Sequence, residues 1–402
     1  MQLEMRDTLN HSRLQTRLAT FSEFGGESIV EVRNGVPHYI NEFWTAGQRQ
    51  GHRLHEVSYR ACFKPQLPAF FIDLLTEPGD VVYDPFMGRG TTPIEANLKG
   101  RVAFGNDANP LSILLTEPRL NTPTLGQVRE RLAEIPWKSF DDFEHDELLP
   151  FYHPDTLAMI EGLRSWMIER SNNNLLDNTD KWIRMVAINR LTGHSPGFFS
   201  VYTMPPNQAV SIETQVKINA KRNQSPTRRE VPDIILKKSK SLLSQGGAST
   251  DSYKLLTKKS HETNEIPDAS VSLTVTSPPF LDIVQYEADN WLRCWFAGIE
   301  VEKVGISSHK KVEDWQDFTH QTLRELVRIT KPGGHIAYEV GEVRNKTVFL
   351  EEHVLEASSG LAIEPEAVMI NQQDFTKTSN CWGVGNNAAG TNTNRIVIFR
   401  RT

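Results

Sequence analysis

The sequence predicts an α/β protein with a Rossmann-like sheet, helices on both faces of the sheet, and an inserted region between two halves of the chain. Three observations support this prediction. Two apolar runs, 81–83 and 271–275, each lead into a motif rich in glycine or proline. The first motif is followed by a helical pattern and a second short apolar run, as in a βαβ unit. About 180 residues separate the two motifs and supply the inserted region.

The first half of the chain is predicted to hold the beginning of the sheet. Residues 1–50 form a polar lead-in with few periodic signals, and 59–75 indicate a loop that feeds an apolar helix. Residues 81–83 then form a buried strand, 92–98 a helix that ends at Lys99-Gly100, and 101–105 a second strand.

The inserted region contains helical patterns at 166–168 and 182–188. Between them and the second motif, residues 193–207 combine aromatic, proline and small polar residues. Such a stretch either presents side chains to bases and phosphates or forms a packed irregular loop. Both interpretations stay open.

The last part of the chain predicts alternating strands and helices that complete the sheet. The strands and helices are expected, in order, at 253–256 (strand), 271–275 (strand), 286–295 (helix), 318–329 (helix), 335–340 (strand) and 394–399 (strand). Residues 331–334 form a turn, and the run 394–399 is expected to close the sheet.

The composition is that of an ordinary globular chain, with 402 residues of which 38% are hydrophobic and 23% charged. No apolar run approaches the roughly 18–20 residues of a spanning helix, and a secretory signal is not recognisable. We therefore expect a cytoplasmic protein without membrane association. The three cysteines, Cys62, Cys294 and Cys381, are widely spaced and imply neither a disulfide framework nor a metal site.

The formal net charge of −6 does not by itself indicate a nucleic-acid-binding protein. The charge is unevenly distributed, however, because basic residues gather between Lys217 and Lys240 whereas 141–147 is an acidic run. The basic stretch is either a solvated face or a DNA-binding surface. In the second case the candidate contacts are Lys221, Arg222, Arg228 and Arg229.

The first motif, 84–92, predicts a ligand loop at the carboxyl end of a strand, where open α/β sheets bind their ligands. Gly88 and Gly90 allow a tight turn, and Asp107 lies 23 positions after Asp84, about where nucleotide-binding units place an acid on the ribose hydroxyls. A nicotinamide-binding loop is disfavoured because Pro93 occupies the place of a third glycine. A phosphate-binding loop is disfavoured because no Gly-Lys-Ser/Thr follows.

The motif Asp-Pro-Phe-Met-Gly-Arg-Gly-Thr-Thr at 84–92 and the motif Ser-Pro-Pro-Phe at 277–280 together resemble those of the DNA amino-methyltransferases. This resemblance covers most of the chain. It implies a class I methyltransferase sheet and S-adenosyl-L-methionine as the cofactor. The residues it assigns to the cofactor are Lys64, Asp84, Phe86, Gly88, Gly90, Thr91, Thr92 and Asp107. For Lys64, a snorkelling lysine beside a helix that starts with proline is the plainer alternative.

The resemblance also implies a catalytic role for residues 277–280. The Ser277 side chain and the Pro278 carbonyl take hydrogen bonds from an exocyclic amine, Phe280 stacks on the base, and Pro279 stiffens the turn. The domains implied are a cofactor half at 1–120, an inserted target-recognition region at 121–250 and a catalytic half at 251–402. No metal is implied.

The Ser-Pro-Pro-Phe form is usual for cytosine-N4 enzymes, although it is less usual in this motif order. We therefore expect a site-specific DNA methyltransferase that modifies the N4 of a flipped cytosine, in restriction-modification or phage defence, with DNA and possible cognate defence components as partners. Three alternatives stay open: an adenine-N6 enzyme, an RNA base-amine methyltransferase and a catalytically silent nucleic-acid binder.

Overall fold

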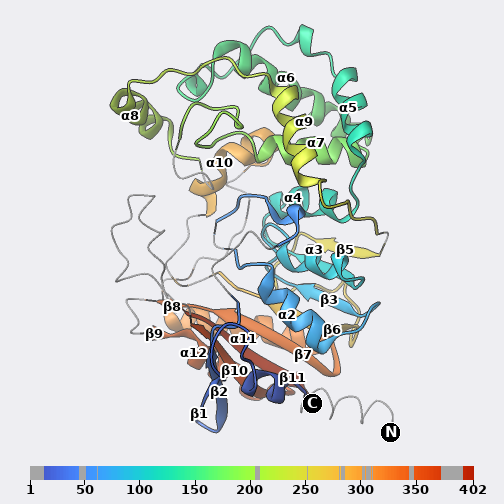
Figure 1. Ribbon diagram of the computed structural model, residues 1–402, viewed down its shortest axis with the longest axis vertical. Coiled ribbons are helices and arrows are strands. Elements are labelled where there is room, and N and C mark those ends of the chain that lie inside the picture. Colours follow the sequence, from blue (N-terminus) through green and yellow to red (C-terminus); the bar gives the residue numbers. More distant parts are fainter. Residues whose placement is uncertain are drawn as a thin grey trace.

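The protein is built on a large twisted sheet, with a group of helices beyond one end of it (Figure 1). The computed structural model describes residues 13–44, 51–60, 62–203, 209–250, 252–279, 281, 286–300, 304, 309, 311–343, 348–372 and 393–402. In this part of the chain the sheet has nine strands, in the order β1-β2-β10-β11-β7-β6-β3-β4-β5.

The central strands run parallel, and an antiparallel strand interrupts the series on one side. Strands β5, β4, β3, β6 and β7 are parallel to one another, β11 is antiparallel to both of its neighbours, and β2 joins β10 in parallel. The strands are β1 (Ile29–Arg33), β2 (Val36–Asn41), β3 (Val81–Asp84), β4 (Val102–Asn106), β5 (Tyr253–Leu256), β6 (Val271–Thr276), β7 (Thr330–Val340), β10 (Ile363–Gln372) and β11 (Thr393–Arg401). A separate pair consists of β8 (Glu342–Val343) and β9 (Val348–Phe349).

Helices cover both faces of the sheet, which confirms the predicted Rossmann-like α/β fold. One face carries α2 (Gln66–Leu75), α3 (Thr91–Leu98) and α4 (Leu111–Leu120), and the other carries α11 (Val312–Ile329) and α12 (Leu350–Ala357). Because side chains alternate along a strand, each central strand feeds both cores. Thus Val82 belongs to the first core and Tyr83 to the second.

A second region, at the top of Figure 1, consists mainly of helices from the insertion. They are α5 (Leu125–Glu134), α6 (Pro154–Asn172), α7 (Asn178–Ile188), α8 (Ile212–Arg222) and α9 (Val231–Leu242), and α10 (Tyr286–Ala297) packs against α4, α6 and α7. The buried Trp182 donates its indole N–H to the hydroxyl of Ser239 at 2.9 Å and so joins α7 to α9. Within the described residues, no helix is both long and apolar enough to cross a membrane.

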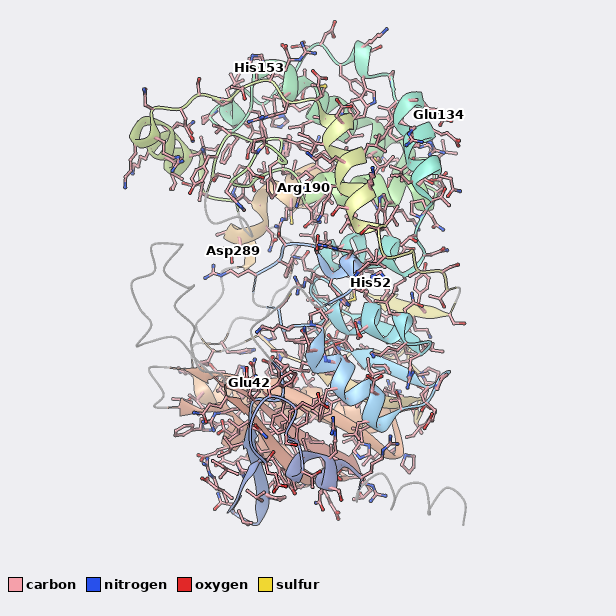
Figure 2. The ribbon with its side chains drawn as sticks, in the orientation of Figure 1. Glu42, His52, Glu134, His153, Arg190 and Asp289 are labelled. Carbon is pink, nitrogen blue, oxygen red and sulfur yellow. The ribbon has the colours of Figure 1, made fainter. Side chains whose placement is uncertain are left out.

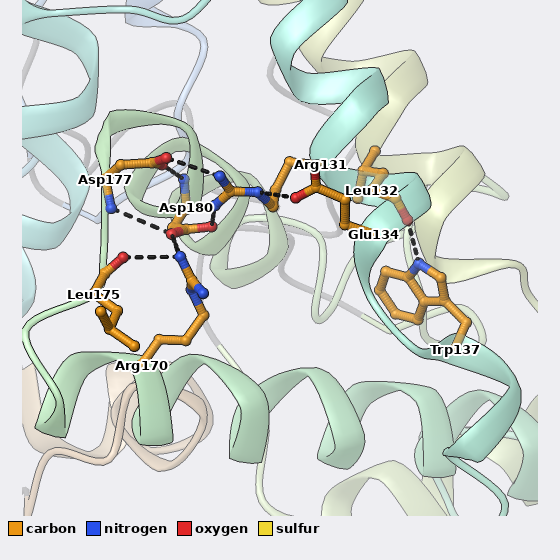
Figure 3. A network of polar contacts seen from close by, with 8 residues as sticks. All are labelled: Arg131, Leu132, Glu134, Trp137, Arg170, Leu175, Asp177 and Asp180. Atoms are coloured by element: carbon orange, nitrogen blue, oxygen red, sulfur yellow. Dashed lines mark hydrogen bonds and ion pairs between the residues drawn. The ribbon is translucent and has the colours of Figure 1, made fainter.

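An ion-pair network fastens three helices of this region together (Figure 3). The side chain of Asp180 on α7 is fully buried and pairs with Arg131 on α5 and with Arg170 on α6, the latter at 2.9 Å. Arg131 also pairs with Asp177, the N-cap of α7, at 2.9 Å. The network therefore fixes how α5, α6 and α7 pack.

The N-terminal segment differs from the predicted polar lead-in, because it contains the hairpin of β1 and β2. Asn34 and Gly35 form its turn with φ of 52° and 82°. Positive φ at both central residues is the geometry of a two-residue hairpin turn, and Asn-Gly is its strongest sequence signal. The prediction missed this signal.

One further prediction about the sheet was wrong. The strand predicted at 394–399 does not close the sheet, since β11 lies between β10 and β7 and the edges are β1 and β5. Its residues are apolar toward both faces, as expected for an inner strand.

The turn predicted at 331–334 lies within the beginning of β7. Thr330 and His335 pair with Val271 and Leu273 of β6, so the four residues between them have no partner in β6, and Gly333 has a φ of 77°.

Candidate active site

A cavity of about 810 Å³ lies at the carboxyl ends of β3, β4 and β6. Both sequence motifs reach it, although they are far apart in the chain. Its lining residues are Tyr59, Cys62, Phe63, Pro85, Phe86, Met87, Gly88, Thr91, Asp107, Ala108, Asn109, Lys258, Lys259, Ser260, Ser277, Pro279 and Phe318. This mixture of apolar, glycine and polar residues suits a small ligand.

The glycine loop between β3 and α3 forms one wall of this cavity. Gly88 and Gly90 both have positive φ, 49° and 79°. A Cβ at Gly90 would lie 2.3 Å from the hydroxyl of Thr116. Gly90 thus lets the loop approach α4 closely, while Gly88 and Thr91 line the cavity.

Asp107 follows β4 and holds the glycine loop from the side. Its Oδ2 accepts the N–H of Gly88 at 2.8 Å, and its Oδ1 accepts the N–H of Asn109 at 2.9 Å. Burial raises the pKa of Asp107, and these hydrogen bonds act in the opposite direction. The carboxylate is therefore held in one orientation at the cavity wall, with lone pairs left for a ligand.

Asp84 and Thr92 lie behind the wall rather than on it. Asp84 is 1% exposed, and its Oδ1 accepts the hydroxyl of Thr276 at 2.6 Å and the N–H of Phe86 at 3.0 Å. Burial raises the pKa of Asp84 to about 7. Thr92 donates its hydroxyl to the carbonyl of Val275 at 3.0 Å. These bonds join the end of β3 to the end of β6, so that the two motifs lie side by side.

The Ser-Pro-Pro turn forms the opposite wall. Ser277 and Pro279 line the cavity, Pro278 is buried, and Phe280 lies outside the described residues. The hydroxyl of Ser277 lies beside the carboxyl of Glu339 of β7, a residue only 4% exposed. Burial raises the pKa of Glu339, and the side chains of Ser277 and Asn394 oppose that shift. No sequence pattern singled out Glu339, because it lies within the apolar run of a strand.

Aromatic side chains supply the apolar part of the wall. The rings of Phe86 and Phe318 lie with their centroids 5.7 Å apart. Phe63 lines the same cavity, together with the thiol-bearing Cys62. Burial raises the pKa of Cys62. Neither Phe318 nor Cys62 was predicted as a site residue.

Arginine side chains tie the loop before α2 to the glycine loop. Arg89 donates to the carbonyls of Val57 at 2.9 Å and of Phe63 at 3.4 Å. The fully buried Arg119 donates to the carbonyl of Leu54 at 2.8 Å and also to that of Arg89. Three segments of the chain are thereby held in one arrangement around the cavity.

Lys64 does not line this cavity. It lines a neighbouring one, on the other side of the loop that Arg89 holds. Burial lowers the pKa of Lys64. The structure thus brings Phe63, rather than Lys64, to the wall of the first cavity.

The four basic residues predicted to contact DNA lie at α8 and before α9. Lys221 and Arg222 are exposed at the end of α8, and the guanidinium of Arg222 lies 3.7 Å from the ring centre of Tyr202. Arg228 already pairs with Asp155 at 3.2 Å and Glu230 at 2.9 Å. These carboxylates reduce the positive potential at Arg228.

Arg229 and two aromatic residues of the stretch 193–207 are less exposed. Arg229 is partly buried, and its backbone N–H donates to the hydroxyl of Thr156 at 2.7 Å. Phe198 and Phe199 are buried, which favours a packed loop at these two residues. Residues 204–208 lie outside the described part of the chain.

Comparison with protein families matches residues 7–116 to the N6_N4_Mtase family, whose description is DNA methylase. The matched segment contains the glycine loop and Asp107. Two curated relatives are type II methyltransferases. M.MjaII of Methanocaldococcus jannaschii is 31% identical over 84 residues, covering 21% of this chain and 16% of that protein. M.MvaI of Kocuria varians is 23% identical over 197 residues, covering 44% and 42%.

The chain thus spans less than half the length of either curated relative, and the matches support the predicted family for the cofactor half. Among solved structures, TrmN of Thermus thermophilus is 10% identical with a TM-score of 0.33, covering 87% of this chain and 52% of that one. A methyltransferase of Methanosarcina mazei dependent on S-adenosylmethionine is 9% identical with a TM-score of 0.34, covering 82% and 96%. These likenesses are low, and the fold assignment rests on the strand order described above.

Proposed function

We propose that the protein transfers a methyl group from S-adenosyl-L-methionine to the exocyclic amino group of a base in DNA. The observation that carries this proposal is the single cavity lined by both the glycine loop and the Ser-Pro-Pro turn. The match of residues 7–116 to DNA methylases and the names of the two curated relatives support the reaction and the substrate.

The residues around the cavity fit the cofactor. Phe86 and Phe318 offer apolar surface to an adenine ring. Asp107 keeps acceptor lone pairs that suit ribose hydroxyls. When bound, the cofactor supplies an electrophilic methyl group.

The protein's own contribution is to aim the amine. The nitrogen of an exocyclic amine is a poor nucleophile because its lone pair is delocalised into the ring. Ser277 and the Pro278 carbonyl accept hydrogen bonds from this amine, which favours a pyramidal nitrogen and directs its lone pair toward the methyl group. In this role the hydroxyl of Ser277 donates its own proton to the neighbouring carboxyl of Glu339, which leaves the oxygen free to accept. Positioning of this kind contributes several kcal/mol to lowering the barrier.

The remaining carbonyl of the turn is already used. The indole N–H of Trp315 donates to the carbonyl of Pro279 at 2.9 Å. Since prolines carry no N–H, neither Pro278 nor Pro279 can donate a hydrogen bond to the Pro278 carbonyl. Trp315 is a fully buried residue of α11, so the turn is anchored to a rigid part of the fold.

We assign the target as cytosine N4 on the basis of Ser277, with adenine N6 as the alternative. The names of the curated relatives support a place in restriction-modification, and the helical region at 121–250 is the proposed target-recognition element. In this role it presents Lys221, Arg222, Arg228 and Arg229 to the DNA backbone.

The test is a transfer reaction with plasmid DNA, digestion to nucleosides and identification of the product by mass. N4-methylcytosine is expected, and Ser277→Ala is expected to lower turnover about 100-fold without changing cofactor affinity. N6-methyladenine alone would replace the cytosine assignment. Transfer only to RNA in a parallel reaction would replace the substrate, and no transfer to either nucleic acid would overturn the proposal.

A further inference from the structure

A second cavity of about 820 Å³ lies beside the candidate active site and has a very different lining. Its wall is polar and strongly basic, whereas the wall of the first cavity is mainly apolar. The lining residues are Gly51, His52, His55, Glu56, Val57, Ser58, Lys64, Pro65, Arg89, Arg190 and Lys238. Nothing in the proposed reaction uses this cavity.

The charges around the cavity do not balance. Among the described residues that line it, three cationic side chains, those of Arg89, Arg190 and Lys238, face one carboxylate, that of Glu56. Glu56 is shared, since it pairs with Lys238 at 3.1 Å and also with Arg53. Within the described residues, neither Arg89 nor Arg190 forms an ion pair with a carboxylate. The cavity therefore carries excess positive charge.

These cations are held in place and partly stripped of water. The guanidinium of Arg190 lies 4.0 Å from the ring centre of Phe198, which fixes its plane. Burial lowers the pKa of Lys64 and Lys238, and that of Arg190 to about 10. A bound anion would offset this cost of burying charge. In addition, Nδ1 of the buried His55 has no hydrogen-bond partner among the described residues.

The place of the cavity in the fold links it to the active site. The loop before α2 separates the two, with Tyr59, Cys62 and Phe63 on one side and Ser58 and Lys64 on the other. In the glycine loop, likewise, Gly88 lines the first cavity and Arg89 the second. Arg190 and Lys238 come from the helical region. Figure 2 shows Arg190 and His52 where that region meets the sheet.

We propose that this second cavity binds a backbone phosphate of the DNA strand whose base enters the active site. A phosphodiester carries one negative charge and acceptor oxygens that match the guanidinium fork and the lysine ammonium. The site is built jointly by the glycine loop and the helical region, so a phosphate held there would fix the strand relative to both. This inference rests on the proposed function, because it takes DNA as the substrate.

The test compares lysines of one helix, α9, by measuring binding of a fluorescent DNA duplex across a salt series. Lys238 lines the cavity, whereas Lys240 is exposed on the same helix. Lys238→Gln should weaken binding several-fold and reduce the slope of log affinity against log salt by about 1. Lys240→Gln should leave the slope unchanged, and calorimetry should give the same cofactor affinity for both variants.

A second variant should strengthen DNA binding rather than weaken it. Glu56→Gln removes the carboxylate among the described lining residues of the cavity and should tighten DNA binding. An unchanged salt slope in Lys238→Gln, or equal loss in Lys240→Gln, would overturn the proposal. Inorganic phosphate that binds this cavity but is not displaced by DNA would also overturn it. If the wild type binds DNA but transfers no methyl group, the proposed function fails while the lysine comparison still decides this inference.

Discussion

The hydroxyl of Ser277 lies beside the carboxyl of Glu339, a buried residue of the neighbouring strand β7, and opposes the rise in its pKa. The register explains this proximity, because Thr276 lies opposite Tyr338 and the next residue of each strand follows at the end of β6. Asn394 of β11 donates to Oε1 of the same carboxylate. Three adjacent strands thus bring Ser277, Glu339 and Asn394 together.

We predict that Glu339→Gln lowers turnover about tenfold and leaves cofactor affinity unchanged. If the amide oxygen of Gln keeps the hydrogen bond from Asn394, its NH₂ group is left to donate to Ser277 and to occupy the oxygen that the target amine needs. Single-turnover rates and calorimetry measure the two quantities separately.

The pH profile distinguishes this positioning role from a structural one. Burial raises the pKa of Glu339. The acid limb of the wild-type rate profile should therefore have an apparent pKa above the ordinary range for a glutamate, and Glu339→Gln should lack this limb. A variant that keeps the acid limb, or that loses cofactor affinity in step with rate, would contradict the role.

Asp107→Asn is predicted to weaken cofactor binding by about 10–100-fold, because a carboxylate oxygen becomes a donor beside the N–H of Gly88 or of Asn109. Isothermal calorimetry measures the change. Asp80→Asn is the matched control, since Asp80 lies just before the opposite end of β3 and accepts a hydrogen bond from Ser272. Equal losses in both variants would indicate a general effect on the strand.

Asp84 should make stability depend on pH. Its pKa is raised from 3.8 to about 7, so the stabilisation by the neutral form is fully present below pH 3.8 and is lost as the pH rises through 7. Asp84→Asn imitates the neutral form. In the absence of cofactor, the unfolding free energy of the wild type should fall relative to the variant, by at most roughly 1.4 kcal/mol per pH unit in that range. Chemical denaturation at a series of pH values measures both proteins. The same dependence of unfolding free energy on pH in the wild type and the variant would refute the role of Asp84.

The ion-pair network of the helical region predicts a large effect on stability. Asp180→Asn should reduce the unfolding free energy by about 3 kcal/mol, because it leaves Arg131 and Arg170 without their buried partner. Glu134→Gln is the control, since its side chain is 65% exposed and a surface pair contributes less than about 1 kcal/mol. If chemical denaturation gives comparable losses of unfolding free energy for the two variants, burial of Asp180 does not strengthen the network.

The motifs at the strand ends were predictable from the sequence, because a strand, a glycine turn and a distant acid leave local signals. The position of β11 was not, since an apolar run does not reveal its neighbours in the sheet. Glu339 was hidden for a related reason. It becomes a site residue only through the pairing of β6 with β7, and pairing between distant segments has no local signature.

Lys64 illustrates a different limit. The resemblance assigned Lys64 to the cofactor. Adjacent residues of a loop can face opposite sides, however, and here Phe63 faces the first cavity while Lys64 faces the second. Which residue faces the ligand depends on the path that Arg89 imposes on the loop. That path is set by tertiary hydrogen bonds.

The pairing of β2 with β10 has a consequence for synthesis of the chain. The N–H groups of Phe43 and Trp44 donate to the side chain of Asn371, 328 and 327 positions away. At ~5–20 residues per second, the N-terminal hairpin waits roughly 15–65 s for this partner. Ile29, Val30 and Val32 remain exposed even in the finished sheet. The first strands to leave the ribosome are thus among the last to be docked, and during that interval they can pair with another nascent chain.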